Sequence, residues 1–134
     1  MRTPPSLHAR GFTIVELMIV VGVIALLAAI ALPNFLRARK RSQAAIILED
    51  LRVMDSAVDQ YAIETNKSGG ATATWTDIRG YLKTGSHIYN SNGVDLFGAT
   101  YIGFTVDAVP KLRSSSFDKL SDVAPSDFWS PYYP

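Results

Sequence analysis

Two hydrophobic patterns follow each other along the first half of this chain. From Phe12 to Leu32 almost every side chain is apolar, and no charged or polar side chain occurs between Leu17 and Leu32. At about 1.5 Å per helical residue, a 21-residue run spans roughly 30 Å, the thickness of the hydrocarbon core of a bilayer. The run is therefore predicted to be a helix long enough to cross a membrane.

After Asn34 the apolar residues narrow to one stripe, with alternating steps of four and three. The stripe consists of Ile47, Leu51, Met54, Val58 and Tyr61. This period is typical of an amphipathic helix. The opposite face is expected to be solvated, and it carries Glu49, Asp50, Arg52, Asp55 and Asp59.

A single helix is predicted from Phe12 to Glu64, because no glycine or second proline follows Pro33 before "TNKSGG" supplies a stop at Thr65 to Gly70. Such a helix is about 80 Å long, more than the remaining chain can cover, so lipid or neighbouring subunits must bury its first half. Pro33 is expected to bend or loosen it.

The remaining chain predicts a small α+β head. "ATWTDIRGYLKTG" indicates a short second helix, with Thr74 as a candidate N-cap and Gly85 as a stop. "SHIYN" predicts a brief strand before an Asn92-Gly93 turn, and "TYIGFTVDAV" a better strand that ends before Pro110. We expect the resulting antiparallel sheet to cover the apolar stripe. The aromatic ending, with Phe128, Trp129, Tyr132 and Tyr133, is expected to pack over it.

Composition narrows the function classes. The chain has 134 residues, which is enough for one domain. It has no cysteine, which excludes disulfides and thiol chemistry. Its net charge of +1 gives no overall electrostatic attraction for nucleic acid. The only histidines are His8 and His87, and no nucleophile elbow, phosphate loop or metal-spaced histidine pair occurs. The sequence therefore predicts that the protein is not an enzyme.

Local charges raise two questions. Glu16 lies inside the apolar run, where an unpaired acid costs about 2.5–3.5 kcal/mol at mid-bilayer and less near an end.

A basic cluster of Arg37, Arg39, Lys40 and Arg41 follows the run and outnumbers the basic residues before it, so charge counting would place the carboxyl-terminal part in the cytoplasm. Contact with lipid head groups explains this cluster better than nucleic acid, which is not an expected partner. Pairing with the acidic stretch of another subunit is the alternative.

The opening segment has three interpretations. A secretory signal peptide would use Ala29-Ile30-Ala31 as its cleavage pattern and release a soluble secreted domain starting at Leu32. A plain single-span anchor would leave Glu16 near the membrane interface. The third interpretation rests on a family resemblance.

The segment "RGFTIVELMIVVGVIALLAAIALPNF", Arg10 to Phe35, resembles the amino-terminal signature of the type IV pilin and pseudopilin superfamily. The resemblance implies that a prepilin peptidase/methyltransferase cuts after Gly11 and methylates Phe12. It also implies that Glu16 pairs with the Phe12 amine of a neighbouring subunit in a homo-oligomeric filament, and that Pro33 kinks the helix. This pairing would explain why an acid occurs in the apolar run.

A second, partial resemblance lies in the head. "DLFGATY" is similar to the Asp-Pro-Trp-Gly-x-x-Tyr signature of the major pseudopilin of type II secretion: Asp95, Gly98 and Tyr101 agree, while Leu96 and Phe97 depart from it. Proteins of that family usually end in a calcium-binding loop rich in Gly and Asp, and this loop is missing here. No cofactor is expected; the weak candidates for calcium are Asp118, Asp122 and Asp127, whose spacing copies no known loop.

The sequence thus predicts a structural subunit with four parts. These are a cleaved cytoplasmic leader (1–11), a transmembrane and filament-core helix (12–33), an amphipathic helix of the head (34–64) and a small α+β head (65–134). Membrane lipid and an inner-membrane assembly platform are the further partners implied, with the head in the periplasm before assembly. The function expected is a type II secretion pseudopilus; a type IV pilus for adhesion or motility is the alternative.

Overall fold

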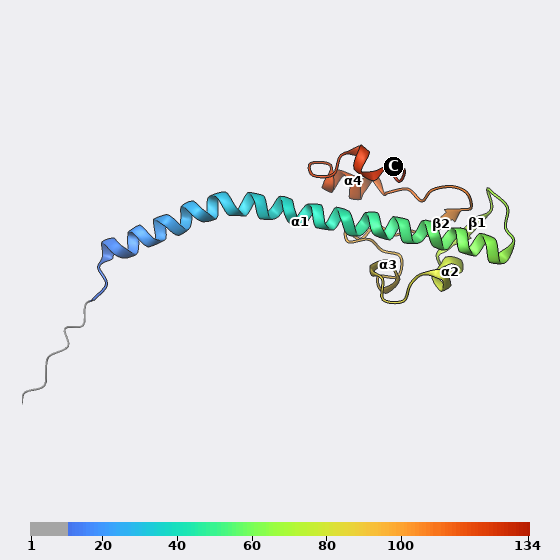
Figure 1. Ribbon diagram of the computed structural model, residues 1–134, viewed down its shortest axis with the longest axis horizontal. Coiled ribbons are helices and arrows are strands. Elements are labelled where there is room, and N and C mark those ends of the chain that lie inside the picture. The colour runs from blue at the N-terminus through green and yellow to red at the C-terminus, as the bar shows by residue number, and fades with distance from the viewer. Residues whose placement is uncertain (1–10) are drawn as a thin grey trace, which may run out of the picture. The chain divides into compact units, whose positions relative to one another are not determined.

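The computed structural model describes residues 11–134, so residues 1–10 of the predicted leader lie outside the described residues. The chain divides into two compact units, residues 1–36 and 37–134, and each is described by itself. A long helix, α1 (Ile14–Thr65), contributes residues to both units (Figure 1). Its bounds agree with the predicted helix from Phe12 to Glu64 to within two residues at each end.

The first unit is the apolar part of α1. Every described side chain from Gly11 to Leu36 is exposed, including Phe12 at 81% and Leu26 at 65%. This part of α1 is long and apolar enough to cross a membrane. Its surface is therefore left for something outside the single chain to cover.

The second unit surrounds the rest of α1 with short elements. These are β1 (Thr72–Thr74), α2 (Trp75–Ile78), the 3₁₀ helix η1 (Arg79–Tyr81), α3 (His87–Asn90), β2 (Gly103–Thr105), α4 (Ser114–Leu120) and the 3₁₀ helix η2 (Ser126–Trp129). Figure 1 shows α4 on one side of α1, with α2 and α3 on the other. The predicted α+β class is confirmed.

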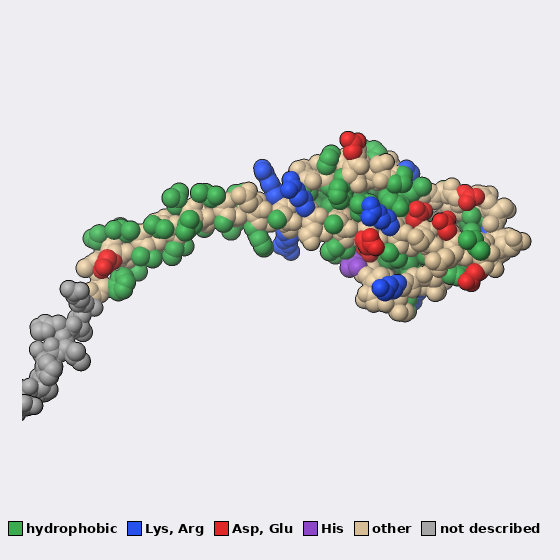
Figure 2. Space-filling view, viewed as in Figure 1, with side chains coloured by type: hydrophobic (Ala, Val, Ile, Leu, Met, Phe, Trp, Pro, Cys, Tyr) green, Lys and Arg blue, Asp and Glu red, His purple; other side chains and the backbone are tan. Residues whose placement is uncertain are grey.

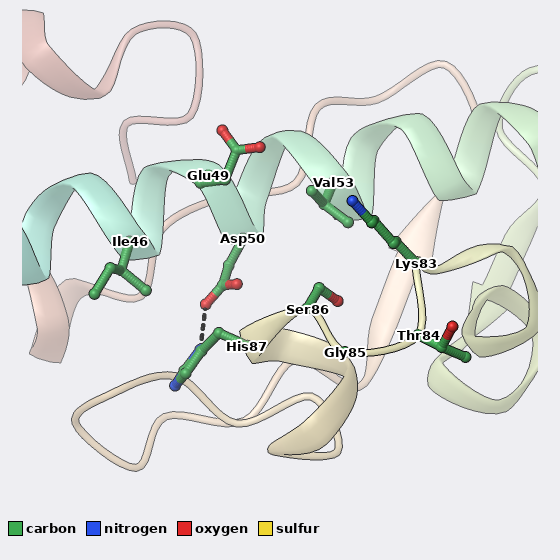
Figure 3. Close-up of a pocket in the computed structure, with 9 residues that line it drawn as sticks. All are labelled: Ile46, Glu49, Asp50, Val53, Lys83, Thr84, Gly85, Ser86 and His87. Carbon is green, nitrogen blue, oxygen red and sulfur yellow. Dashed lines mark hydrogen bonds and ion pairs between the residues drawn. The ribbon is translucent and has the colours of Figure 1, made fainter.

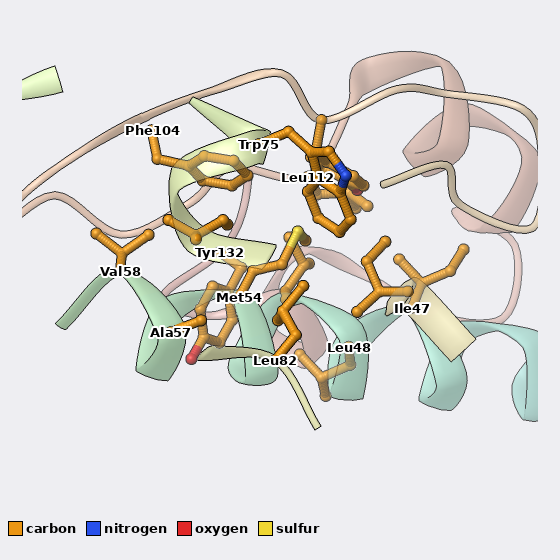
Figure 4. Close-up of a cluster of buried hydrophobic side chains, with 14 of the residues drawn as sticks. Ile47, Leu48, Met54, Ala57, Val58, Trp75, Leu82, Phe104, Leu112 and Tyr132 are labelled. Atoms are coloured by element: carbon orange, nitrogen blue, oxygen red, sulfur yellow. The ribbon is translucent and has the colours of Figure 1, made fainter. Parts of the chain in front are cut away.

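The hydrophobic core forms on the predicted stripe of α1. Ile47, Leu51 and Met54 are fully buried, Val58 nearly so, and Tyr61 partly. Side chains from the rest of the unit close over them, among them Trp75, Leu82, Phe104, Leu112 and Tyr132 (Figure 4). The amphipathic pattern of the sequence thus explains why the rest of the second unit packs against this part of α1.

The sheet is smaller than predicted and has a different first strand. β1 pairs antiparallel with β2, with Ala73 opposite Phe104. The predicted strand at 86–90 is wrong: its residues form α3, because Ser86 caps this helix by accepting a hydrogen bond from the backbone N–H of Tyr89. The predicted Asn92-Gly93 turn is present, with both residues at positive φ, 56° and 80°.

The predicted second helix begins where expected. The carboxylate of Asp77 accepts hydrogen bonds from the backbone N–H and the hydroxyl of Thr74, at 2.8 and 2.6 Å. α2 then continues into η1, and Gly85 follows at φ +91°. The predicted capping pattern is therefore confirmed at its first turn.

Two of the four aromatic side chains of the ending, Trp129 and Tyr132, are buried in the head. Trp129 is completely buried and donates its indole N–H to the carbonyl of Ala124 at 3.0 Å, and Tyr132 is 7% exposed. Phe128 and Tyr133 remain 40% and 42% exposed. The expectation that the tail packs down is correct for the first pair and wrong for the second.

Candidate functional site

Glu16 stands at the amino-terminal end of α1, next to Thr13. Its carboxylate Oε2 accepts hydrogen bonds from the backbone N–H of Thr13 at 3.0 Å and from the Thr13 hydroxyl at 2.9 Å. In return, the Glu16 backbone N–H donates to the Thr13 hydroxyl at 3.2 Å. This reciprocal pattern is a capping box, which satisfies donors that no helical carbonyl reaches.

The pattern Thr-x-x-Glu before an apolar run is the sequence signal of this capping box. It gives Glu16 a first role inside one subunit, through Oε2. Among the described residues, Oε1 of Glu16 has no hydrogen-bond partner, so it can still accept a bond from outside the chain.

Gly11 and Phe12 precede this cap and are both exposed. Neither belongs to the helix, and no side chain lies within 4 Å of the position that a Cβ would take at Gly11. The cleavage and methylation predicted here remain predictions.

Pro33 lies within the continuous assignment of α1 and has no N–H to donate. The side-chain amide of Asn34 donates to the carbonyl of Ile30 at 3.3 Å, so a polar group follows the proline in an otherwise apolar stretch. Beside Pro33, a shallow groove is lined by the small side chains of Ala25, Ala28 and Ala29. The predicted kink at Pro33 stays a prediction.

The amino-terminal sequence of this chain is similar to that of known proteins. The model of the prokaryotic N-terminal methylation motif matches residues 7–32. The chain is 41% identical over 59 residues to the type IV wide pilus major component PilA4 of Thermus thermophilus, which covers 44% of this chain and 45% of that protein. This likeness of the amino-terminal segment supports the type IV pilin superfamily.

Two further relatives match a similar share of the chain at a similar identity. The type IV major fimbrial protein FimA of Dichelobacter nodosus is 36% identical over 67 residues, covering 50% of this chain and 43% of FimA. The type IV major pilin protein PilE1 of Neisseria gonorrhoeae is 36% identical over 81 residues, covering 55% of this chain and 49% of PilE1. The chain thus spans less than half the length of these relatives. No solved structure matches it.

In the head, the residues of "DLFGATY" form a turn held by a buried carboxylate. Asp95 is 5% exposed, and its Oδ1 accepts hydrogen bonds from the backbone N–H groups of Phe97 and Ala99 at 2.9 and 2.8 Å. Its Oδ2 accepts from the hydroxyl of Ser116 on α4, a partner with no signal in the sequence. Gly98 has φ +86°, which favours glycine.

Tyr101, the third motif residue of this pilin-like head, is buried under Arg113. The Arg113 guanidinium lies 5.8 Å from the centre of its ring. The hydroxyl of Tyr101 has no hydrogen-bond partner among the described residues, and burial raises the pKa of Tyr101 well above 10. The motif residues thus act together as a structural turn, with Asp95 fully engaged by the chain itself.

Asp50 corrects the prediction of a solvated face opposite the stripe. It is 3% exposed, and its carboxylate accepts from Nδ1 of His87 at 2.7 Å (Figure 3). It also accepts from the backbone N–H of Ile88 at 3.2 Å. Burial raises the pKa of Asp50, and the contacts with His87 and Ile88 oppose that rise. His87, predicted to be structural or exposed, is structural: it helps hold the loop before α3 to α1.

The weak calcium candidates do not assemble into a site in the described part of the chain. No group of three or more acidic, histidine or cysteine side chains there is placed to hold a metal ion. Asp122 instead contacts the ammonium of Lys40 at 2.7 Å, which lowers the pKa of Asp122. Asp118 and Asp127 are exposed.

Proposed function

We propose that this chain is a structural subunit of a helical type IV pilin-like filament. Before assembly, residues 12–33 hold it in a membrane, with the head on the extracytoplasmic side. The observation that supports this most strongly is the first unit, a helix of membrane length whose side chains are all exposed and which carries one acid at its start. Such a helix is stable only among lipid or other copies of itself.

Processing belongs to the same proposal. A prepilin peptidase cuts between Gly11 and Phe12 and methylates the new amine, which then carries a positive charge. Glu16 of one copy accepts from this amine in the neighbouring copy, and its capping bonds to Thr13 keep the carboxylate at the helix end. The further partners are the processing enzyme and an inner-membrane assembly platform. No catalytic role, cofactor or nucleic acid is proposed.

The intact mass and amino-terminal sequence of the protein from its native membrane test the processing step. We expect a start at methylated Phe12. A start at Leu32 would mean a signal peptide and a soluble secreted domain, and an uncut amino terminus would leave a plain anchor. Either of these would overturn the proposal.

Glu16→Ala tests the assembly step. We expect the variant to reach the membrane in normal amount with a folded head, since the core of the head starts at Ala44, yet to give no filaments in sheared fractions. Glu16→Gln is the matched control, because it keeps a side-chain oxygen for the cap but removes the charge. We expect no filaments from Glu16→Gln either, and normal filament yield from either variant would contradict the pairing.

Two filaments fit this subunit. The relatives are named as pilus and fimbrial components, which favours a type IV pilus. The pseudopilus of a type II secretion system is favoured by the turn at Asp95, Gly98 and Tyr101. Deletion of the gene distinguishes them: loss of long surface fibres with secretion intact supports the pilus, and loss of secreted proteins supports the pseudopilus.

A further inference from the structure

Charges of opposite sign gather at opposite ends of the second unit. Arg37, Arg39 and Arg41, here called the arginine group, are exposed at one end, and no ion pair joins them to an acid among the described residues. Only their neighbour Lys40 is paired, with Asp122. Figure 2 shows basic side chains gathered on α1 just past its apolar part, while most of the acidic ones lie toward its other end.

The other end holds a hollow with two unpaired acids, here called the acidic hollow. It has a volume of about 570 Å³ and is lined by Asp59, Ile63, Lys67 and Asp107, among others. Neither Asp59 nor Asp107 forms an ion pair in residues 11–134, although Lys67 lines the same hollow. Ile63 is 80% exposed, which leaves an apolar wall beside the carboxylates.

We propose that the acidic hollow of one copy receives the arginine group of a second copy, with Arg41 beside Asp59. A guanidinium pairs with carboxylates through several fixed N–H groups, and its stem packs on apolar surface such as Ile63. The inference rests on the proposed filament and names a contact between heads within it. Since Arg41 and Asp59 are 18 residues apart on α1, the second copy is displaced by about 27 Å along the helix.

The membrane orientation supplies a further reason. Basic residues next to a span normally stay on the cytoplasmic side, and the arginine group lies on the other side in the proposed orientation. A pairing made in the assembled state compensates for this cost. Anionic lipid head groups would offer the arginines a partner as well, but they offer none to Asp59 and Asp107, so a second copy accounts for both ends at once.

Cysteine cross-linking tests the contact directly, because the chain has no cysteine of its own. Arg41→Cys with Asp59→Cys cannot close a disulfide within one copy, since the two positions on one helix are separated by far more than the roughly 7 Å that a disulfide allows. We expect a ladder of linked subunits in oxidised filaments. The matched control is Arg41→Cys with Glu49→Cys, which is also exposed and also too far apart within one copy, and which should give no ladder.

Charge reversal gives an independent readout. Arg41→Glu and Asp59→Arg should each lower filament yield at least about tenfold, because each places like charges together. The double variant restores the pair in every subunit and should recover most of the yield. Arg52→Glu and Glu49→Arg, exposed reversals on the same helix but outside the two groups, should leave the yield near that of the unchanged protein.

The outcomes separate this contact from the filament itself. If the unchanged protein forms no filaments, the proposed function fails and this inference with it. If filaments form but the Arg41 and Asp59 cysteines give no ladder and the double reversal does not recover, only the contact is wrong. If Arg41→Glu instead weakens binding to vesicles of phosphatidylglycerol and phosphatidylcholine, and Asp59→Arg has no effect on assembly, the arginine group serves lipid, which also overturns it.

Discussion

At the scale of single residues, two buried carboxylates define the head. Asp50 and Asp95 are both nearly inaccessible, and each accepts a hydrogen bond from a side chain. Asp50 also accepts from one backbone N–H, and Asp95 from two. Asp50 connects α1 to α3, and Asp95 connects its own turn to α4 through Ser116. A buried acid is tolerated when its oxygens are satisfied in this way, and its removal leaves donors without acceptors.

Asp50→Ala should lower the free energy of unfolding by about 1–3 kcal/mol, because the buried N–H of Ile88 loses its acceptor. Asp50→Asn should cost less, since its amide oxygen can still accept from Ile88. Urea titration in detergent, followed by tryptophan fluorescence, measures both. Equal losses for Ala and Asn would contradict the hydrogen-bonding role.

The stability of the unchanged protein and that of Asp50→Asn should also depend differently on pH. Burial raises the pKa of Asp50 above its unfolded value, so its proton contributes stability that is complete below that unfolded value, near pH 4, and is lost as pH rises through the folded pKa. Asn has no such proton. The stability of Asp50→Asn relative to the unchanged protein should therefore increase as pH rises from about 4 through the folded pKa of Asp50. A constant difference would show that Asp50 does not titrate with a raised pKa.

Two glycines at positive φ offer a matched comparison. Gly93 and Gly98 have φ of +80° and +86°, but a Cβ at Gly93 would lie 2.8 Å from the ring of Trp75, whereas a Cβ at Gly98 meets nothing within 4 Å. Gly98→Ala should cost about 1 kcal/mol for its backbone conformation, and Gly93→Ala clearly more. Similar unfolding midpoints for the two variants would argue against close packing of Trp75 on the turn.

At the scale of elements, the long helix was predictable and the short ones were less so. The period of Ile47, Leu51, Met54 and Val58 is repeated over several turns, so it outweighs local preferences. The four residues of α3 carry β-favouring Ile88 and Tyr89, and tertiary packing with Asp50 decides their conformation instead. The burial of Asp50 itself could not be read, because its partner His87 lies 37 residues away in the sequence.

The candidate assembly site shows the same contrast. Gly11, Phe12, Glu16 and Pro33 stand in one ungapped segment, and local sequence identifies them all. The acidic hollow joins the end of α1 to the turn after β2, so Asp107 comes beside Asp59 only in the folded head. The pairing of Asp95 with Ser116 is nonlocal in the same way.

The carboxyl-terminal aromatic pair gives a prediction at this scale. Trp129 is fully buried in η2 while its neighbour Phe128 is 40% exposed. Trp129→Ala should destabilise the head by about 3–5 kcal/mol, through lost contacts and the cavity left behind. Phe128→Ala, the control, should cost less than about 1 kcal/mol. Thermal unfolding measures both, and comparable losses would mean that the tail does not seal the core through Trp129.

At the scale of the whole molecule, the two units have opposite requirements. In residues 11–36, the described part of the first unit, no side chain is buried, and the buried residues of the core all come from Ala44 onward. The second unit is thus a self-contained fold that happens to begin inside a helix. A subunit built in this way can exchange lipid for neighbouring helices around its first unit without repacking its head.

This independence predicts the behaviour of a truncated protein. Residues 37–134 expressed alone should be soluble without detergent, monomeric by analytical ultracentrifugation, and should unfold at the same urea midpoint as the head of the full chain. The reason is that truncation removes exposed apolar surface and no core contact. Aggregation, or a lower midpoint, would instead mean that the apolar half of α1 stabilises the head.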